Sequence, residues 1–257
     1  MKELRDEAVV LRTYKSGESD RVCVVWTRHH GKVRVLAKGV RKTSSRMGGS
    51  LEPMGHVSVD LVKGRGDLWI TKNVTHLERL TNLRSEYARI AAGLAVVEVV
   101  DAIPTDEAAD EGIFEMLVRV LATLDNVDFH PELVASSFFF KLLAYDGSEP
   151  VVDHCVNCGS PGPLVAFNAE VGGMLCANCR SGTAVSPEAL QLIRRILGGD
   201  LAAVLRHEPP AGSGEVMALA HEAIEVHFGK RLKVSRSTAP LAPPRAPPVG
   251  QTPPTPS

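Results

Sequence analysis

The stretch Arg21-Val-Cys-Val-Val-Trp-Thr-Arg-His-His-Gly-Lys-Val-Arg-Val-Leu-Ala-Lys38 decides how the first part of the chain folds. Its opening segment, Arg21–Thr27, carries the β-branched and aromatic residues that strands favour. The next four residues, Arg28–Gly31, form a polar turn that ends in glycine. From Lys32 to Lys38 an apolar residue recurs at every second position, which is the period of a strand with one buried face. The stretch therefore predicts two consecutive strands joined by a tight turn.

Three further segments around this stretch also have the composition of strands. They are the apolar run Ala8–Leu11, the alternating residues Val57–Leu61 and the segment Leu68–Leu77. Turn residues at Lys15–Asp20 and Lys63–Asp67 separate them from their neighbours. Five short strands within about eighty residues favour a small Greek-key barrel of the OB type. The SH3-like barrel is the competing architecture, because periodicity does not separate the two.

The chain after the predicted barrel has helical periodicity. Apolar residues recur every three or four positions in Leu83–Val100, and a second helix is expected from a cap at Asp106 to Leu124. Pro131 occupies a first helical position and opens a third helix. Ser186 followed by proline is the start of another helix, because the serine hydroxyl caps the first turn.

Four of the five cysteines form two pairs, Cys155-Val-Asn-Cys158 and Cys176-Ala-Asn-Cys179. Two residues between thiolates let one tight turn direct both sulfurs to a common point, so two such pairs predict a tetrahedral four-sulfur site. Thiolates in this geometry select zinc or an iron–sulfur cluster, and the spacing favours one zinc ion. Four protein ligands leave no open position for water, so the zinc is expected to be structural. The fifth cysteine, Cys23, is expected to be a small buried hydrophobic residue.

The predicted fold class is α+β, built of several modules. An N-terminal OB-type β-barrel precedes an α-helical bundle with an inserted four-cysteine zinc-ribbon-like element, in which Leu164–Asn168 and Gly172–Leu175 pair as a hairpin. The expected division is a basic barrel at 1–80, helices at 81–150, the zinc-binding insertion at 151–183, C-terminal helices at 184–237 and a disordered proline-rich tail at 238–257.

Charge is divided unevenly along the chain. Residues 1–80 contain 16 basic and 9 acidic side chains, whereas residues 81–257 contain 13 basic and 21 acidic ones. No acidic residue interrupts the stretch from Arg28 to Ser50. An excess of cations on one strand and its following loop favours contact with the phosphate backbone of a nucleic acid. The residues predicted to bind nucleic acid are Arg28, Lys32, Arg34, Lys38, Arg41, Lys42 and Arg46.

Two aromatic residues of the same segment bear on the binding of single strands. Tyr14 and Trp69 would offer stacking surfaces for bases, which together with cations make up the usual single-strand platform. The alternative for both side chains is a place in the barrel core, where aromatic residues of small barrels usually lie.

The composition is that of a globular protein, with 44% hydrophobic and 23% charged residues among 257. No apolar run approaches the roughly 20 residues that span a bilayer, and the N-terminus alternates charges where a signal peptide would be apolar. We therefore expect a cytoplasmic protein with no membrane partner. The chain has no phosphate-binding loop and no His-Glu-x-x-His motif, so the sequence indicates neither nucleotide hydrolysis nor a zinc protease.

The order of these parts resembles the RecO family of bacterial recombination mediators. The similarity is carried by residues 8–14, 31–42, 51–53 and 172–179, which read Ala-Val-Val-Leu-Arg-Thr-Tyr, Gly-Lys-Val-Arg-Val-Leu-Ala-Lys-Gly-Val-Arg-Lys, Leu-Glu-Pro and Gly-Gly-Met-Leu-Cys-Ala-Asn-Cys. It extends over residues 3–235, so the proline-rich tail lies outside it.

This resemblance implies a non-enzymatic protein of recombinational DNA repair, associated with the nucleoid. Family members bind single- and double-stranded DNA, anneal complementary strands and act with the partner RecR. Together they help load the recombinase RecA onto strands covered by single-strand-binding protein. The alternative function is that of a zinc-ribbon transcription or RNA-processing factor, which would show sequence preference, whereas a protein that binds phosphate charge would not.

Overall fold

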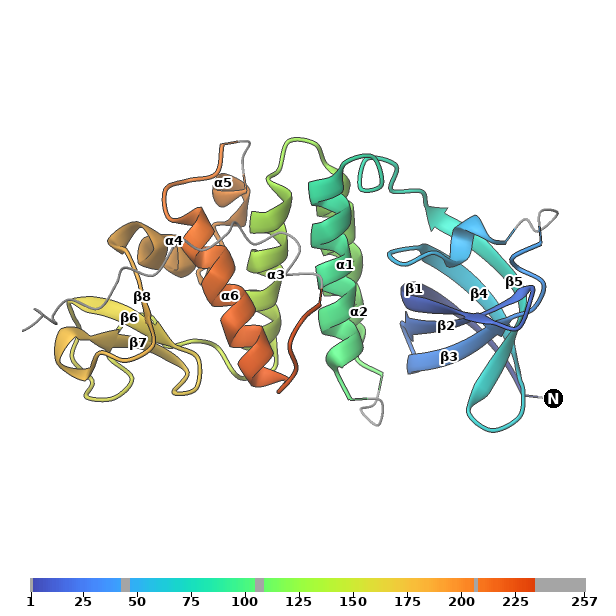
Figure 1. The fold of residues 1–257 in the computed structure, drawn as a ribbon, viewed down its shortest axis with the longest axis horizontal. Helices are drawn as coiled ribbons and strands as arrows, with labels where there is room; N and C mark the ends of the chain where they lie inside the picture. Colours follow the sequence, from blue (N-terminus) through green and yellow to red (C-terminus); the bar gives the residue numbers. More distant parts are fainter. Residues whose placement is uncertain (1, 43–46, 105–108, 206–207, 234–257) are drawn as a thin grey trace, which may run out of the picture.

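The computed structural model describes residues 2–42, 47–104, 109–205 and 208–233 of the chain. Its three parts follow one another along the longest axis, with a β-barrel at one end, a group of helices in the middle and a small sheet at the other end (Figure 1). The sequence-predicted fold class is therefore confirmed. Arg46, Asp106 and the tail at 238–257 lie outside the described residues.

Five strands form the closed barrel: β1 (Glu3–Ser16), β2 (Asp20–Thr27), β3 (Gly31–Ala37), β4 (His56–Lys63) and β5 (Leu68–Glu78). Their order around the barrel is β1-β2-β3-β5-β4, with β1 bonded to β4. The β3–β5 pair is parallel and the other pairs are antiparallel. This order is that of the OB fold, so it separates the two architectures that periodicity left open. The first strand is longer than the apolar run Ala8–Leu11 that predicted it.

The barrel interior is filled by the apolar positions of the alternating strands. In β3 the buried residues are Val33, Val35 and Ala37, as the period of two predicts. Cys23 on β2 is fully buried in the same core, and burial raises the pKa of its thiol to about 12. Its expected role as a buried hydrophobic residue is confirmed.

The helical region covers one outer face of the barrel. Val9 on β1, and Val24 and Trp26 on β2, are buried in the same hydrophobic cluster as helix α1 (Tyr87–Ala102). Strand β2 therefore has both of its faces buried, one in the barrel and one against helices. Gly93 lets α1 lie close to Met54, because a Cβ atom at position 93 would be 2.4 Å from the Met54 sulfur.

The other helices are α2 (Glu111–Asp125), α3 (Pro131–Tyr145), α4 (Pro187–Leu197), the single turn α5 (Leu201–Val204) and α6 (Ser213–His227), and a 3-10 turn spans Gly49–Leu51. Pro131 opens α3 as predicted, and the hydroxyl of Ser186 accepts a hydrogen bond from the backbone N–H of Ala189, 3.2 Å away, at the start of α4. Helix α2 starts later than expected. Its cap is Asp110, whose carboxylate accepts from the N–H of Ile113 at 3.0 Å.

Arg89 links two helices from within the core. Its buried guanidinium donates to the carbonyl oxygens of Leu124 and Asn126, both at 2.8 Å, and to that of Val127 at 3.0 Å. These carbonyls lie at the C-terminal end of α2 and in the two residues after Asp125, where carbonyls lack partners inside the helix. One side chain of α1 thus supplies hydrogen-bond donors for the free carbonyl groups at the end of α2.

Candidate metal centre and nucleic-acid interface

The four paired cysteines come from the loop and hairpin that follow α3. Cys155 and Cys158 lie in the loop before β6 (Leu164–Asn168). Cys176 ends β7 (Gly173–Cys176), and Cys179 ends the following 3-10 turn, Ala177–Cys179. Strands β6 and β7 form the predicted antiparallel hairpin, and the two-residue strand β8 (Thr183–Ala184) adds to β6 on its other side.

The structure brings the four cysteine sulfurs together. All four Sγ atoms lie within 4.8 Å of one another, and those of Cys158 and Cys176 are 3.7 Å apart. A tetrahedral metal with sulfur ligands at about 2.3 Å has sulfurs roughly 3.8 Å apart, so the observed spacing fits such an ion. The cluster is able to bind a metal ion through four ligands.

Backbone groups prepare one of these thiols for a metal. The backbone N–H of Cys176, followed by those of Cys158 and Asn157, lowers the pKa of the Cys155 thiol to about 6. Hydrogen bonding with Cys158 and Cys176 instead raises the pKa of Cys179 to about 12. A metal ion must displace the protons of the other thiols, so its binding depends on pH.

The cysteine module packs against the helical region on its inner side. Phe167 of β6 and Met174 of β7 are buried in the main hydrophobic cluster, whereas Cys155 and Cys176 belong to a small separate cluster with Leu175. The guanidinium of Arg194 on α4 donates to the carbonyl oxygen of Val152 at 2.7 Å. Folding of the cysteine module therefore places Phe167 and Met174 in the hydrophobic core of the helical region.

Four of the predicted DNA-binding residues form an exposed set, which we call the basic face. These residues are Arg34, Lys38, Arg41 and Lys42. None of them has an ion-pair partner within the residues that the structure describes. The loop that carries the last two is held at its start, since the carboxylate of Asp20 accepts a hydrogen bond from the N–H of Gly39 at 2.7 Å. The basic face thus offers cations to an external anion.

Arg28 is placed differently from the prediction that the basic stretch is exposed. Its guanidinium pairs with Glu7 at 2.9 Å, with Glu111 at 2.8 Å and with Glu115 at 2.5 Å. It also lies over the ring of Phe114, 4.7 Å from the centroid. Three carboxylates neutralise this cation and join the barrel to α2, so its place in a phosphate-binding set is corrected to an interface role.

Lys32 is also not exposed, although strand alternation directs it outward. Its side chain is only 7% exposed, because the C-terminal end of α1 covers this part of β3. Its ammonium donates to the carbonyl oxygens of Asp101, at 2.9 Å, and of Ile103. The alternation of apolar residues correctly predicts that Lys32 points out of the barrel. It carries no information about a helix that packs on that outer side.

The two aromatic residues differ in their surroundings. Tyr14 is 38% exposed, and the guanidinium of Arg12 lies 5.9 Å from its ring centroid. Trp69 is 8% exposed and belongs to the barrel core, with the ammonium of Lys63 4.9 Å from its ring centroid. Tyr14 keeps an accessible ring for stacking, whereas Trp69 exposes only a small part of its side chain.

One polar cluster at the β2–β3 turn was not predicted. The buried carboxylate of Asp6 accepts hydrogen bonds from the rings of His29, at 2.9 Å, and His30, at 2.8 Å. Burial by itself would raise the pKa of Asp6, but these hydrogen bonds and two from backbone N–H groups lower it. The His-His-Gly turn was visible in the sequence, but its carboxylate partner lies on another strand.

Family comparisons agree with this architecture in both parts of the chain. Residues 1–78 match the family described as Recombination protein O N terminal, and residues 84–236 match Recombination protein O C terminal. The chain belongs to the RecO family.

Similar RecO proteins cover most of this chain. A DNA repair protein RecO of Streptomyces coelicolor is 37% identical over 238 residues, which is 88% of this chain and 96% of the relative. One of Streptomyces griseus is 36% identical over 239 residues, with the same two shares. One of a Nocardioides species is 38% identical over 206 residues, or 78% of this chain and 84% of the relative. The chain is thus a RecO protein of DNA repair and recombination.

Within the described ranges, no helix combines the length and the apolar character that crossing a bilayer requires.

Proposed function

We propose that this RecO protein binds single- and double-stranded DNA through the basic face and anneals complementary strands. The observation that carries the proposal is that Arg34, Lys38, Arg41 and Lys42 are exposed and lack ion pairs within the described residues. Cations in this state neutralise phosphates without first breaking an internal ion pair, and each contact releases counterions. A face of this kind lowers the repulsion between two polyanionic strands.

The proposed role is that of a mediator rather than an enzyme. Annealing makes and breaks only base pairs, so it needs no nucleophile and no general base. In the cell, at the nucleoid, the protein would act with RecR to load RecA onto strands covered by single-strand-binding protein. The support for these partners is membership of the RecO family together with the basic face.

We propose that the four-cysteine cluster binds one structural zinc ion. The ligands would be Cys155, Cys158, Cys176 and Cys179, whose sulfurs fit a tetrahedral ion. Four protein ligands saturate zinc, so the ion would hold the module in place and would not activate water. Its contribution is to the folding of the part of the chain that packs on α3 and α4.

Annealing of two complementary oligonucleotides tests the proposed function. The double variant Lys38→Ala/Arg41→Ala removes two cations of the basic face, whereas Arg5→Ala/Lys72→Ala removes one arginine and one lysine that already have partners, Asp60 and Glu3. We expect the first variant to anneal more slowly than wild type and the second to anneal normally, both with and without single-strand-binding protein. Equal annealing by all three proteins would refute the assignment.

Binding of the wild-type protein and the two variants to duplexes of different sequence distinguishes the proposed function from the alternative one. A zinc-ribbon transcription or RNA-processing factor would bind one sequence much more tightly than unrelated ones, because base contacts carry specificity. We expect instead that affinity for unrelated duplexes of equal length is similar.

A further inference from the structure

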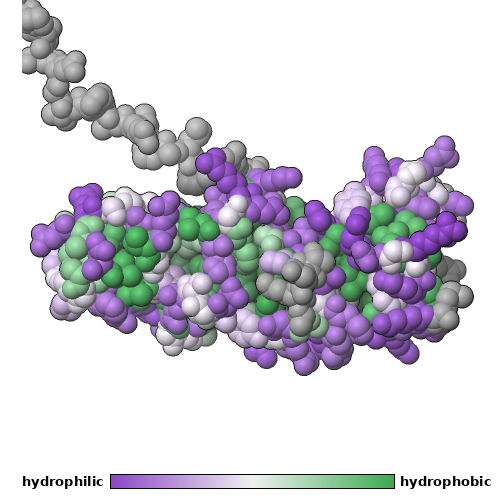
Figure 2. Space-filling model, turned by 90° about the horizontal axis from the view of Figure 1, so that it is seen from below, coloured by the Kyte–Doolittle hydropathy of each residue, from purple (hydrophilic) through white to green (hydrophobic). Residues whose placement is uncertain are grey.

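A cavity of about 480 Å³ opens at one end of the barrel, between β3 and the loop that joins β4 to β5. Its floor is apolar and is formed by the core residues Leu4, Val33 and Trp69. Seen from below, hydrophobic residues show between hydrophilic ones at the barrel end of the molecule, on the right of Figure 2. We call this cavity the seam pocket, because β3 is paired with β5 only from Arg34 onward and leaves a gap before it.

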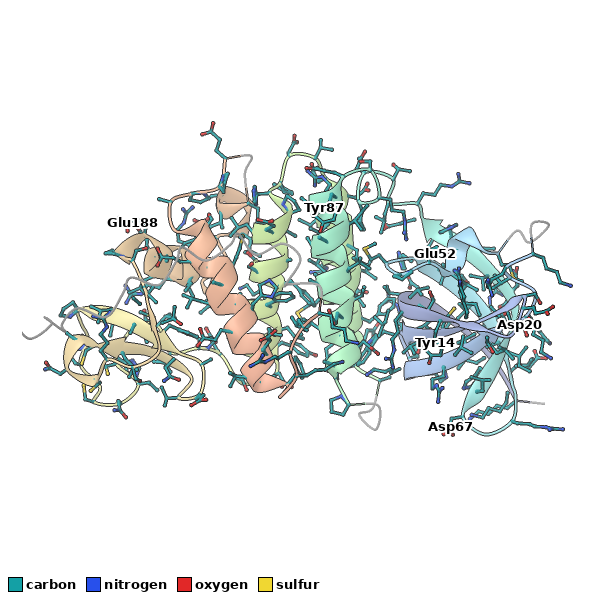
Figure 3. All side chains as sticks on the ribbon, viewed as in Figure 1. Tyr14, Asp20, Glu52, Asp67, Tyr87 and Glu188 are labelled. Atoms are coloured by element: carbon teal, nitrogen blue, oxygen red, sulfur yellow. The ribbon has the colours of Figure 1, made fainter. Side chains whose placement is uncertain are left out.

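Lys32, which is bound to the end of α1, also lines the seam pocket, and three exposed polar side chains form its rim. They are His30, Arg34 and Asp67, all exposed. The Nδ1 atom of His30 is held by Asp6 at 2.8 Å, so the imidazole has a fixed place. Asp67 lies at the lower tip of the barrel, on the β4–β5 loop (Figure 3), and its carboxylate has neither an ion pair nor a hydrogen bond among the described residues. An apolar floor with a few polar groups above it is the usual composition of a ligand site.

We propose that the seam pocket takes up one unstacked base of a bound single strand, and that Asp67 selects bases with an exocyclic amino group. This inference rests on the proposed DNA binding, because Arg34 belongs both to the basic face and to the rim of the pocket. A strand whose phosphates lie along Arg34 and Lys38 passes the mouth of the pocket. The apolar floor then shields one face of a base from water.

The selectivity follows from the chemistry of a carboxylate. An ionised carboxylate only accepts hydrogen bonds. The amino group of cytosine donates one, whereas uracil has a carbonyl oxygen at the same position, which an ionised Asp67 repels. Arg34 bonds to phosphate in either case, so it raises affinity without selecting a base.

Binding of oligo(dC) and oligo(dU) of equal length at one salt concentration and one mildly alkaline pH tests this inference. The two bases differ at the fourth ring position, an amino group in cytosine and a carbonyl oxygen in uracil, and at N3, which carries a hydrogen only in uracil. A preference for oligo(dC) therefore reports contact at the fourth position and not at N3. We expect wild-type protein to bind oligo(dC) about tenfold more tightly, since one hydrogen bond to a charged group has about that effect. Asp67→Ala should bind both strands equally. The matched control is Asp60→Ala, which removes the same charge from β4, outside the pocket.

The possible outcomes distinguish a failure of the base-binding pocket from a failure of the proposed DNA binding. If wild type binds neither strand, the proposed DNA binding is wrong and the pocket falls with it. If wild type binds both strands equally, DNA binding stands and the selective pocket is refuted. If the preference for oligo(dC) persists in Asp67→Ala, or is lost in Asp60→Ala, Asp67 is not the selecting residue.

Discussion

The ammonium of Lys32 lies 2.9 Å from the carbonyl oxygen of Asp101, and this hydrogen bond joins strand β3 to the C-terminal end of α1. The carboxylate of Asp101 is also buried, and its Oδ2 atom pairs with Arg12 of β1 at 3.1 Å. Burial raises the pKa of Asp101, and the nearby cations Arg12, Lys32 and Lys230 oppose this by favouring the ionised form. The contact fixes the barrel against the helices, and among the residues of β3 it leaves Arg34 exposed.

Replacing Lys32 should therefore destabilise the protein. Lys32→Met is expected to lower the free energy of unfolding by about 2–4 kcal/mol, because Asp101 is left buried with one cation fewer. The exposed Arg34→Met should change it by less than about 0.5 kcal/mol. Chemical denaturation measures both values. Equal stability of the two variants would show that the Lys32 contact does not hold the two parts together.

Loss of the four-cysteine site should lower the stability of the protein and leave its proposed DNA-binding residues unchanged. Cys155→Ser is expected to remove the bound zinc and to destabilise the C-terminal half, since metal binding contributes to the folding of such modules. Cys23→Ala, the control, changes a buried cysteine outside the cluster and should keep one zinc per chain. Elemental analysis and thermal unfolding provide the two readouts. Purified wild-type protein that holds no metal and shows four reactive thiols would contradict the prediction.

Asp6 should make stability depend on pH in the acid range. Its pKa in the folded state is below 3.8, so the ionised carboxylate stabilises the fold above this pH and the stabilisation is lost as pH falls through the folded pKa. The difference in free energy of unfolding between wild type and Asp6→Asn should be full at neutral pH and shrink below 3.8. Denaturation across this range measures it. A difference that grows with falling pH would mean that burial, and not the histidine partners, dominates.

Deleting residues 238–257 should leave folding and DNA binding unchanged. The segment contains eight prolines and few large apolar residues, so it has little surface to bury. Thermal unfolding and oligonucleotide binding of the shortened chain check this expectation. A lower unfolding temperature after truncation would show that the tail contacts the folded part.

The features that the sequence predicted well are local ones. The alternation at Val33, Val35 and Ala37 fixed the buried face of β3, and the spacing of each cysteine pair fixed the two turns that present the sulfurs. Proline at the start of α3 and serine before α4 marked helix starts, because caps act on adjacent residues.

The features that it missed depend on contacts between distant segments. Nothing within the stretch around Lys32 reports that the end of α1, far along the chain, covers it. The same holds for Arg28, whose partners Glu111 and Glu115 come from α2. Alternation identifies the outward side of a strand, but only tertiary structure shows whether that side faces water.

If the basic face contacts DNA phosphates, the affinity for DNA must depend on salt concentration through these residues. The plot of log affinity against log salt concentration for a single-stranded oligonucleotide should be shallower by about 1.4 in Lys38→Ala/Arg41→Ala than in wild type, because each lost phosphate contact removes about 0.7. The slope of Arg5→Ala/Lys72→Ala should match that of wild type. Identical slopes for all three proteins would contradict the claim and place the DNA contact elsewhere on the molecule.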